Sequence, residues 1–220
     1  MGKNVLILAA HGDDEILGTA GAIQFFKDKG YNVYVCLATE GCLTQYEKNK
    51  EVCQEKRQQY KKAMELLGAD EIIELNFPDM QLDTIPHFKL NQAISRVLEK
   101  IQPEILFTHN PVDINLDHRL VYHSTLVAIR PPRPFLKKIY TYEVPSSSEW
   151  NPKSAFLPNY FISIEKYLKK KKQALALLKT ELRNWPHPRS LEGLEALARF
   201  RGMQSGCKYS EAFCLIKSYD

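Results

Sequence analysis

Four ionisable side chains gather near the start of the chain: His11, Asp13, Asp14 and Glu15. They follow directly on an apolar run of strand length. Adjacent carboxylates repel one another, and a helix N-terminus explains only one of them, as a cap. A bound divalent cation explains the histidine and the acids together. The segment therefore predicts a metal site at the end of a strand.

A second cluster of the same residue types lies between Thr108 and Arg119, again after an apolar strand-like segment. Its members are His109, Asp113, Asn115, Asp117 and His118. In an open parallel sheet, ligands bind outside the carboxyl ends of the strands, and neighbouring strands at the switch point bring distant segments together. Two imidazoles and a carboxylate with open positions form the ligand set of a catalytic zinc site. We therefore expect the two clusters to meet.

The elements that must position these clusters alternate along the chain. We expect strands at 4–10, 32–38, 71–75, 104–108 and 138–143, and helices at 14–29, 48–67, 86–101 and 117–129. A strand at 161–164, helices at 165–180 and 191–200, and a strand at 211–216 are expected to complete the same layers. This order predicts an α/β fold, a Rossmann-like three-layer sandwich with a mainly parallel sheet.

Neither a linker-like stretch nor a repeat divides the chain, so residues 1–220 are expected to form a single domain. The polar, Pro-rich stretch 145–158 is expected to be a long surface loop. The net charge is only +4, and the one lysine run, 169–172, fits a solvated helix face, so no nucleic-acid partner is expected. The oligomeric state stays open between a monomer and a homo-oligomer.

The cellular compartment is predicted from apolar runs and cysteines. The apolar run 5–10 is too short for a membrane span or a signal peptide. The five cysteines are odd in number and contain no CxxC pair, which argues against a disulfide framework and against a cysteine zinc cluster. A reducing, cytoplasmic location is therefore expected.

The motifs together resemble the PIG-L/LmbE-like N-deacetylase superfamily. The resemblance rests on His11-Gly12-Asp13-Asp14-Glu15 and on Asp113-x-Asn115-x-Asp117-His118. Further family motifs have their counterparts in Thr39-Glu40-Gly41, Arg57 and Phe77-Pro78-Asp79, and 186–202 is similar to a subset of bacterial members. The match in order and spacing extends along nearly the whole chain.

This resemblance implies a zinc-dependent hydrolase that removes the acetyl group from an N-acetylated amino sugar, such as an N-acetylglucosamine glycoconjugate or a nucleotide sugar. By position, His11, Asp14 and His118 are the metal ligands. Asp13 is the general base for metal-activated water, and Asp117 would orient an imidazole. Ligands of this kind also accept Fe²⁺, Mn²⁺ or Co²⁺.

The chain departs from the family pattern at two positions. Gly12 replaces the usual proline, which would loosen the loop and leave every ligand in place. Asn115 replaces a histidine that could protonate the leaving group, and an asparagine can donate a hydrogen bond but cannot deliver a proton. Asp13 is therefore expected to protonate the leaving amine, with His109 and His187 as further candidates.

Three residues are expected to contact the substrate. Arg57 suits a phosphate or carboxylate, Asp79 suits sugar hydroxyls, and Glu143 ends the fifth strand at the same sheet edge. In addition, the Pro-broken segment with Arg183, His187 and Arg189 is placed to close over the site.

Other functions stay open at this point. A hydrolase of a different amide would use the same metal chemistry. A metal-binding protein without catalysis would have no evident use for Asp13. A nucleotide-binding regulatory module would need a glycine-rich phosphate loop after the first strand, where this chain carries acids that repel phosphate.

Overall fold

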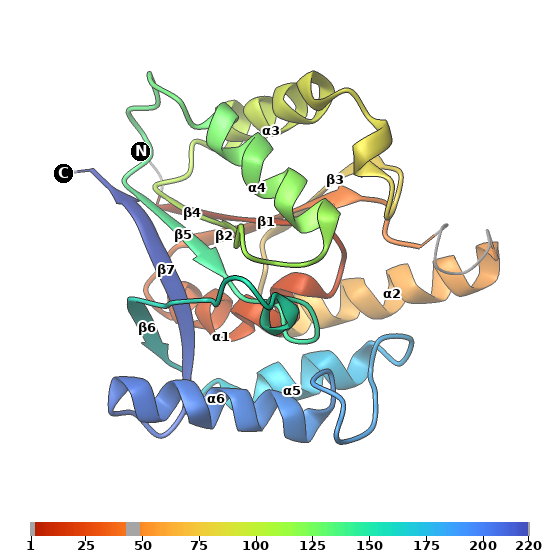
Figure 1. Ribbon diagram of the computed structural model, residues 1–220, viewed down its shortest axis with the longest axis vertical. Coiled ribbons are helices and arrows are strands. Elements are labelled where there is room, and N and C mark those ends of the chain that lie inside the picture. The colour runs from red at the N-terminus through yellow and green to blue at the C-terminus, as the bar shows by residue number, and fades with distance from the viewer. Residues whose placement is uncertain (1–2, 43–48, 220) are drawn as a thin grey trace.

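The computed structural model describes residues 3–42 and 49–219. In this part of the chain a seven-stranded sheet runs in the order β3-β2-β1-β4-β5-β7-β6 (Figure 1). The strands are β1 (Asn4–Ala9), β2 (Asn32–Thr39), β3 (Glu71–Phe77), β4 (Ile105–His109), β5 (Lys138–Tyr142), β6 (Tyr160–Ser163) and β7 (Ser210–Ser218). The pairs among β1 to β5 are parallel, and β7 is antiparallel to β5 and β6. The predicted mainly parallel sheet is confirmed.

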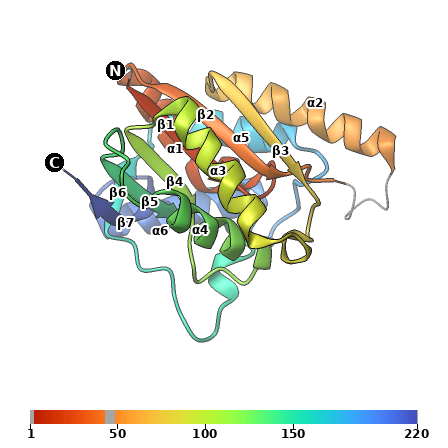
Figure 2. The ribbon, with the colours of Figure 1, turned by 90° about the horizontal axis from the view of Figure 1, so that it is seen from above.

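Helices cover both faces of the sheet. They are α1 (Asp14–Asp28), α2 (Lys50–Leu67), α3 (His87–Ile101), α4 (Leu116–Ala128), α5 (Leu168–Leu177) and α6 (Leu191–Ser205). Helices α3 and α4 lie on one face, and α1, α2, α5 and α6 lie on the other (Figures 1 and 2). The three-layer arrangement is therefore confirmed.

The apolar run of β1 follows from this layering. Ile7 packs into the core on the α1 side of the sheet, and Leu6 and Leu8 pack into the core on the α3 and α4 side. All three side chains are buried. Because helices cover both faces, neither face of the strand suits a polar residue, so the sequence is continuously apolar instead of alternating.

The last third of the chain completes the sheet in an order that the sequence does not show. Strand β7 lies between β5 and β6, although it comes last in the chain. The predicted helix 165–180 is shorter in the structure, Leu168–Leu177. The predicted start of the second helix, Lys48, lies outside the described residues, and the described helix begins at Lys50 after Asn49, whose side chain caps it.

A buried ion pair from two other elements holds the middle of α1. Lys171 Nζ of α5 lies 2.6 Å from Glu211 Oε1 of β7, and both side chains are almost fully buried. Lys171 also donates to the carbonyl of Leu17, and Glu211 accepts from the backbone amides of Gly21 and Ala22, each 2.8 Å away. These bonds fix α1 to α5 and β7.

One pair of cysteines contradicts the expectation of reduced thiols. Cys42 and Cys53 form a disulfide, with 5.5 Å between their Cα atoms. Cys42 follows β2 and Cys53 lies in the first turn of α2, so the connection between these elements brings the two residues together. An odd count still allows one pair, and Cys36, Cys207 and Cys214 remain free thiols.

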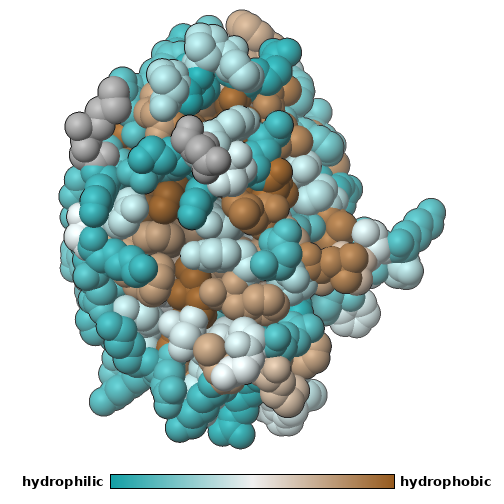
Figure 3. Space-filling view, turned by 90° about the vertical axis from the view of Figure 1, so that its left-hand side faces the viewer, coloured by the Kyte–Doolittle hydropathy of each residue, from teal (hydrophilic) through white to brown (hydrophobic). Residues whose placement is uncertain are grey.

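One face of the molecule carries a group of apolar side chains within a polar margin. Figure 3 shows the face on the side of both chain termini, where polar side chains form the margin and apolar side chains gather in the middle. Within residues 3–42 and 49–219, no helix is long and apolar enough to cross a membrane.

Candidate active site

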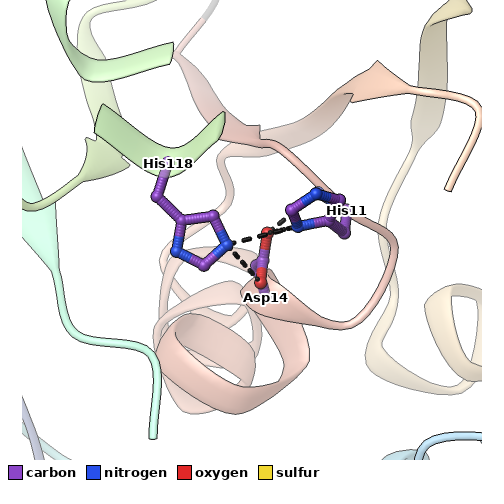
Figure 4. Close-up of side chains that lie close together, drawn as sticks. All are labelled: His11, Asp14 and His118. Atoms are coloured by element: carbon purple, nitrogen blue, oxygen red, sulfur yellow. Dashed lines mark hydrogen bonds and ion pairs between the residues drawn. The ribbon is translucent and has the colours of Figure 1, made fainter. Parts of the chain in front are cut away.

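Three side chains from the two sequence clusters converge at the carboxyl edge of the central strands. His11 follows β1, Asp14 begins α1, and His118 lies in the first turn of α4. Strands β1 and β4 are neighbours, which brings the segments that follow them together. The side chains point toward one another (Figure 4), and one ligand-type atom of each lies within 4.8 Å of the other two.

The contacts among these three residues suit a shared cation. His11 Nδ1 lies 3.2 Å from His118 Nε2, and Asp14 Oδ1 lies 3.2 Å from the same His118 nitrogen. All three residues are buried. Asp14 Oδ1 nevertheless has no hydrogen-bond partner in the described structure, whereas buried polar atoms nearly always have one. Two imidazoles and a carboxylate that face a common point fit a zinc-type ion.

The charges in this cluster keep Asp14 in the form that a metal ligand requires. Burial raises the pKa of Asp14, but the imidazoles of His118, His109 and His11 outweigh burial and hold it well below its usual range. Burial lowers the pKa of His118, but Asp14 and Asp113 raise it to about 9. Asp14 is therefore an ionised carboxylate at neutral pH.

Asp113, for which the sequence predicted no separate role, contacts the His118 nitrogen that faces away from Asp14. Asp113 Oδ2 lies 3.0 Å from His118 Nδ1. The hydroxyls of Ser147 and Ser148 both donate to Asp113, as does the backbone amide of Asn115. The long loop after β5 is thus more than a surface loop, because its two buried serines support a candidate metal ligand.

Two further carboxylates face the other nitrogen of His11. Its Nε2 lies 3.3 Å from Asp117 Oδ2 and 3.5 Å from Asp79 Oδ1. The position of Asp117 suits the expected role of orienting an imidazole. Asp79, expected to bind sugar hydroxyls, is instead buried against His11 and accepts a hydrogen bond from Thr39 Oγ1 at 3.4 Å.

Asp13 is buried beside this cluster and is not used as a helix cap. It occupies the position before α1, yet its side chain makes no capping bond. Its Oδ2 lies 2.9 Å from Arg189 Nη1 but has no hydrogen-bond partner among the described residues. Burial raises its pKa, although Arg189 opposes this. A carboxylate oxygen with free lone pairs, next in sequence to Asp14, is available to accept a proton.

Two residues expected in the active site, Asn115 as catalytic and Glu143 as substrate-binding, also contact other parts of the fold. Asn115 caps α4 by accepting from the backbone amide of Asp117 at 2.9 Å. Glu143 forms two hydrogen bonds with Arg201 of α6, at 2.7 and 2.5 Å. The structure therefore gives Asn115 a capping role and turns Glu143 toward α6 instead of the metal cluster.

The histidines proposed as additional proton donors do not fit that role. His109 is fully buried, accepts from the backbone amide of Ala10 at 2.8 Å and stacks on His118. Burial, aided by the charge of His118, lowers its pKa to about 4, so at neutral pH it is an uncharged imidazole and not the imidazolium that a general acid requires. His187 is exposed and accepts from the backbone amide of Arg189.

A pocket that is partly open to solvent lies beside the loop that carries His11. Its lining includes Gly12, Glu40, Lys56, Arg57 and Tyr60. Arg57, expected to contact the substrate, is exposed on the wall of this pocket.

The glycine that replaces the family proline has a packing reason. A Cβ atom on Gly12 would lie 3.2 Å from Cδ2 of Tyr60 and 3.4 Å from a methyl carbon of Leu37. A Cβ at position 12 would therefore press on the Tyr60 ring, which would have to move by a few tenths of an ångström. The loop is closely packed at this point, which corrects the expectation that Gly12 loosens it.

The fold and the converging histidines and acids define an α/β protein with a candidate metal centre. Residues 6–129 match the PIG-L family, GlcNAc-PI de-N-acetylase, and the chain belongs to this family. The family predicted from the two motifs is thus confirmed.

Similar proteins include both deacetylases and a hydratase. The uncharacterized deacetylase YaiS of Escherichia coli K12 is 29% identical over 182 residues, which cover 79% of this chain and 89% of YaiS. The structure of N,N'-diacetylchitobiose deacetylase from Pyrococcus horikoshii has a TM-score of 0.79 at 22% identity, covering 97% of this chain and 84% of that one. GalB, the 4-carboxy-2-hydroxymuconate hydratase of Pseudomonas putida KT2440, has a TM-score of 0.80 at 21% identity, covering 99% and 98%. The shared fold therefore supports more than one reaction.

Proposed function

We propose that this protein is a metal-dependent deacetylase that hydrolyses the acetamido group of an N-acetylated amino sugar, such as an N-acetylglucosamine glycoconjugate or a nucleotide sugar. The observation that carries the proposal is the convergence of His11, Asp14 and His118, with Asp13 next in the chain and free to accept a proton. Membership of the PIG-L family and a relative named as a deacetylase support the same activity.

The metal would be held by His11, Asp14 and His118, with zinc as the first candidate and Fe²⁺, Mn²⁺ or Co²⁺ as alternatives. Such a cation, when bound, acidifies water and polarises a carbonyl oxygen. Asp113 and Asp117 orient the two imidazoles through the nitrogens that face away from the shared point.

Asp13 would move the protons of the reaction. As a water oxygen adds to the acetamido carbonyl carbon, Asp13 Oδ2 takes a proton from that water. The carbon–nitrogen bond then breaks, and Asp13 returns the proton to the departing amine, leaving acetate and a free amino sugar. Asp13 serves both steps because Asn115 has no proton to deliver and His109 is neutral.

The sugar would occupy the pocket beside Gly12. Arg57 on its wall suits a phosphate or carboxylate attached to the sugar, because a guanidinium binds such groups through two parallel hydrogen bonds. Glu40 and Asn76, also on the wall, suit sugar hydroxyls. Asp79 belongs to the metal cluster in this proposal, and Glu143 pairs with Arg201 outside the pocket.

The test couples metal content to acetate release from N-acetylglucosamine, N,N'-diacetylchitobiose and UDP-N-acetylglucosamine. Wild type is expected to bind about one metal per chain. H118A should lose the metal and the activity, whereas D13N should keep the metal and lose activity by about 100-fold to 10,000-fold. H123A is the matched control, because His123 lies on the same helix and is exposed.

Two results would contradict the proposal. One is a wild-type protein that binds no metal even after reconstitution. The other is a D13N variant that releases acetate at the wild-type rate, which would remove Asp13 as the base.

A further inference from the structure

Arg189 joins three segments around Asp13. It lies between α5 and α6, in a segment that neither signature motif includes. Its Nη1 lies 2.9 Å from Asp13 Oδ2 and donates to Glu181 Oε2 at 3.1 Å. Its Nε donates to Ser146 Oγ, in the loop after β5, at 2.9 Å. One guanidinium thus contacts the loop before α1, the loop after β5 and its own segment.

The geometry at Nη1 leaves the oxygen of Asp13 free. One N–H of this nitrogen donates to Glu181, and its contact with Asp13 Oδ2 lacks the geometry of a hydrogen bond. Arg189 therefore holds the carboxylate as an ion pair at 2.9 Å, and Oδ2 keeps a lone pair that can accept a proton. A base needs this combination of a fixed position and a free lone pair.

Arg189 is itself held in place by a buried glutamate and a half-buried serine. Glu181 is almost fully buried and also lies 2.8 Å from Lys56 Nζ, so its carboxylate is fixed from two sides. Ser146 fixes the other edge of the guanidinium. A long side chain that is already ordered loses little rotamer freedom when it positions another group. The arrangement is that of a rigid support for Asp13.

We propose that Arg189 is a positioning residue for Asp13, and that Glu181 and Ser146 hold Arg189 in the orientation that does this. The inference rests on the proposed function to the extent that Asp13 is the base. It extends the active site to the segment between α5 and α6 and to the loop after β5.

The same segment provides a matched control. Arg183 is exposed, and its guanidinium donates to the backbone carbonyls of Thr180 and Leu182. The R183A variant therefore removes an arginine of the same segment without touching Asp13. It is expected to behave like wild type.

The kinetic test uses acetate release from N,N'-diacetylchitobiose. A displacement of a reacting group by about 1 Å can lower a rate by about 100-fold, so R189A should lower kcat by about that factor while KM and bound metal stay unchanged. R189K keeps the charge without the planar fork and should regain part of the loss. Millimolar guanidinium should restore activity to R189A and have no effect on R183A.

A structural experiment tests the positioning of Asp13 independently of activity. Crystal structures of wild type and R189A should show the Asp13 carboxylate displaced or in several conformations in the variant, with His11, Asp14 and His118 unmoved. S146A, which removes one support and leaves the charge, should show a smaller displacement and a smaller loss of kcat. The S146A variant also tests the positioning role if R189A does not fold.

Three outcomes would overturn the proposal: an Asp13 carboxylate that keeps its wild-type position in both R189A and S146A, an unchanged kcat in R189A, or a raised KM with unchanged kcat, which would make Arg189 a substrate-binding residue. A wild type that releases no acetate from any compound refutes the proposed function instead, and the crystal structures then decide the positioning role.

Discussion

Two lysine–glutamate pairs in this protein have the same geometry and opposite surroundings, which allows a sharp prediction. Lys171 and Glu211 lie 2.6 Å apart with 5% and 4% of their side chains exposed. Lys100 and Glu71 also lie 2.6 Å apart, but 60% and 43% of their side chains are exposed. We expect K171M to destabilise the protein far more than K100M.

The expected magnitude follows from what each change leaves behind. In K171M, Glu211 keeps only the amides of Gly21 and Ala22, and the carbonyl of Leu17 loses its donor. Removing one partner of a buried pair costs about 3–5 kcal/mol. Removing one partner of an exposed pair costs about 0–1 kcal/mol. Domains of this kind unfold with about 5–15 kcal/mol, so the loss in K171M is a large fraction of the total.

The assay is urea unfolding followed by circular dichroism on wild type, K171M, K100M and the double variant K171M/E211Q. The double variant should recover part of the lost stability, because it removes the unpaired buried charge. The reasoning would be refuted if K171M and K100M had the same free energy of unfolding. It would also be refuted if the free energy of unfolding of K171M/E211Q were lower than that of K171M by as much as K171M is lower than wild type.

Three further predictions concern the metal site, the packing of α1 and the disulfide. D113A should weaken metal affinity by about 10-fold to 100-fold, because His118 loses its partner, and competition with a chelator measures this; an affinity equal to wild type would contradict it. G21A should lower stability by about 1–3 kcal/mol or more, because its Cβ would lie 2.3 Å from Cγ2 of Ile164, and an unchanged melting temperature would count against the packing described. C53S, or a reductant, should lower the free energy of unfolding by about 3 kcal/mol for a loop of this length. Equal urea midpoints with and without reductant would show that the disulfide contributes nothing.

Much of the fold and the core of the site follow from local patterns. Apolar runs of strand length, separated by helical segments, fix the parallel sheet and hence the common edge at which loops meet. That edge is why His11 and His118 could be placed together despite their distance in the chain. The acidic residues around them had no other evident use, which made a metal the simplest explanation.

The parts that sequence analysis missed depend on partners far away in the chain. Arg183 and Arg189 are equivalent candidates in the sequence, and only the folded segment shows that one reaches Asp13 and the other solvent. The serines that hold Asp113 sit in a loop whose composition indicates only a surface position. Pairing of this kind has no periodicity that a single sequence reveals.

The contact between Gly12 and Tyr60 has a consequence for how this protein can diverge. Because a Cβ at position 12 would lie 3.2 Å from the tyrosine ring, a larger residue there requires the ring to shift by a few tenths of an ångström. A smaller residue at position 60 alone would leave a cavity. The effect of a substitution at either position therefore depends on the residue at the other, so the two positions are expected to change together.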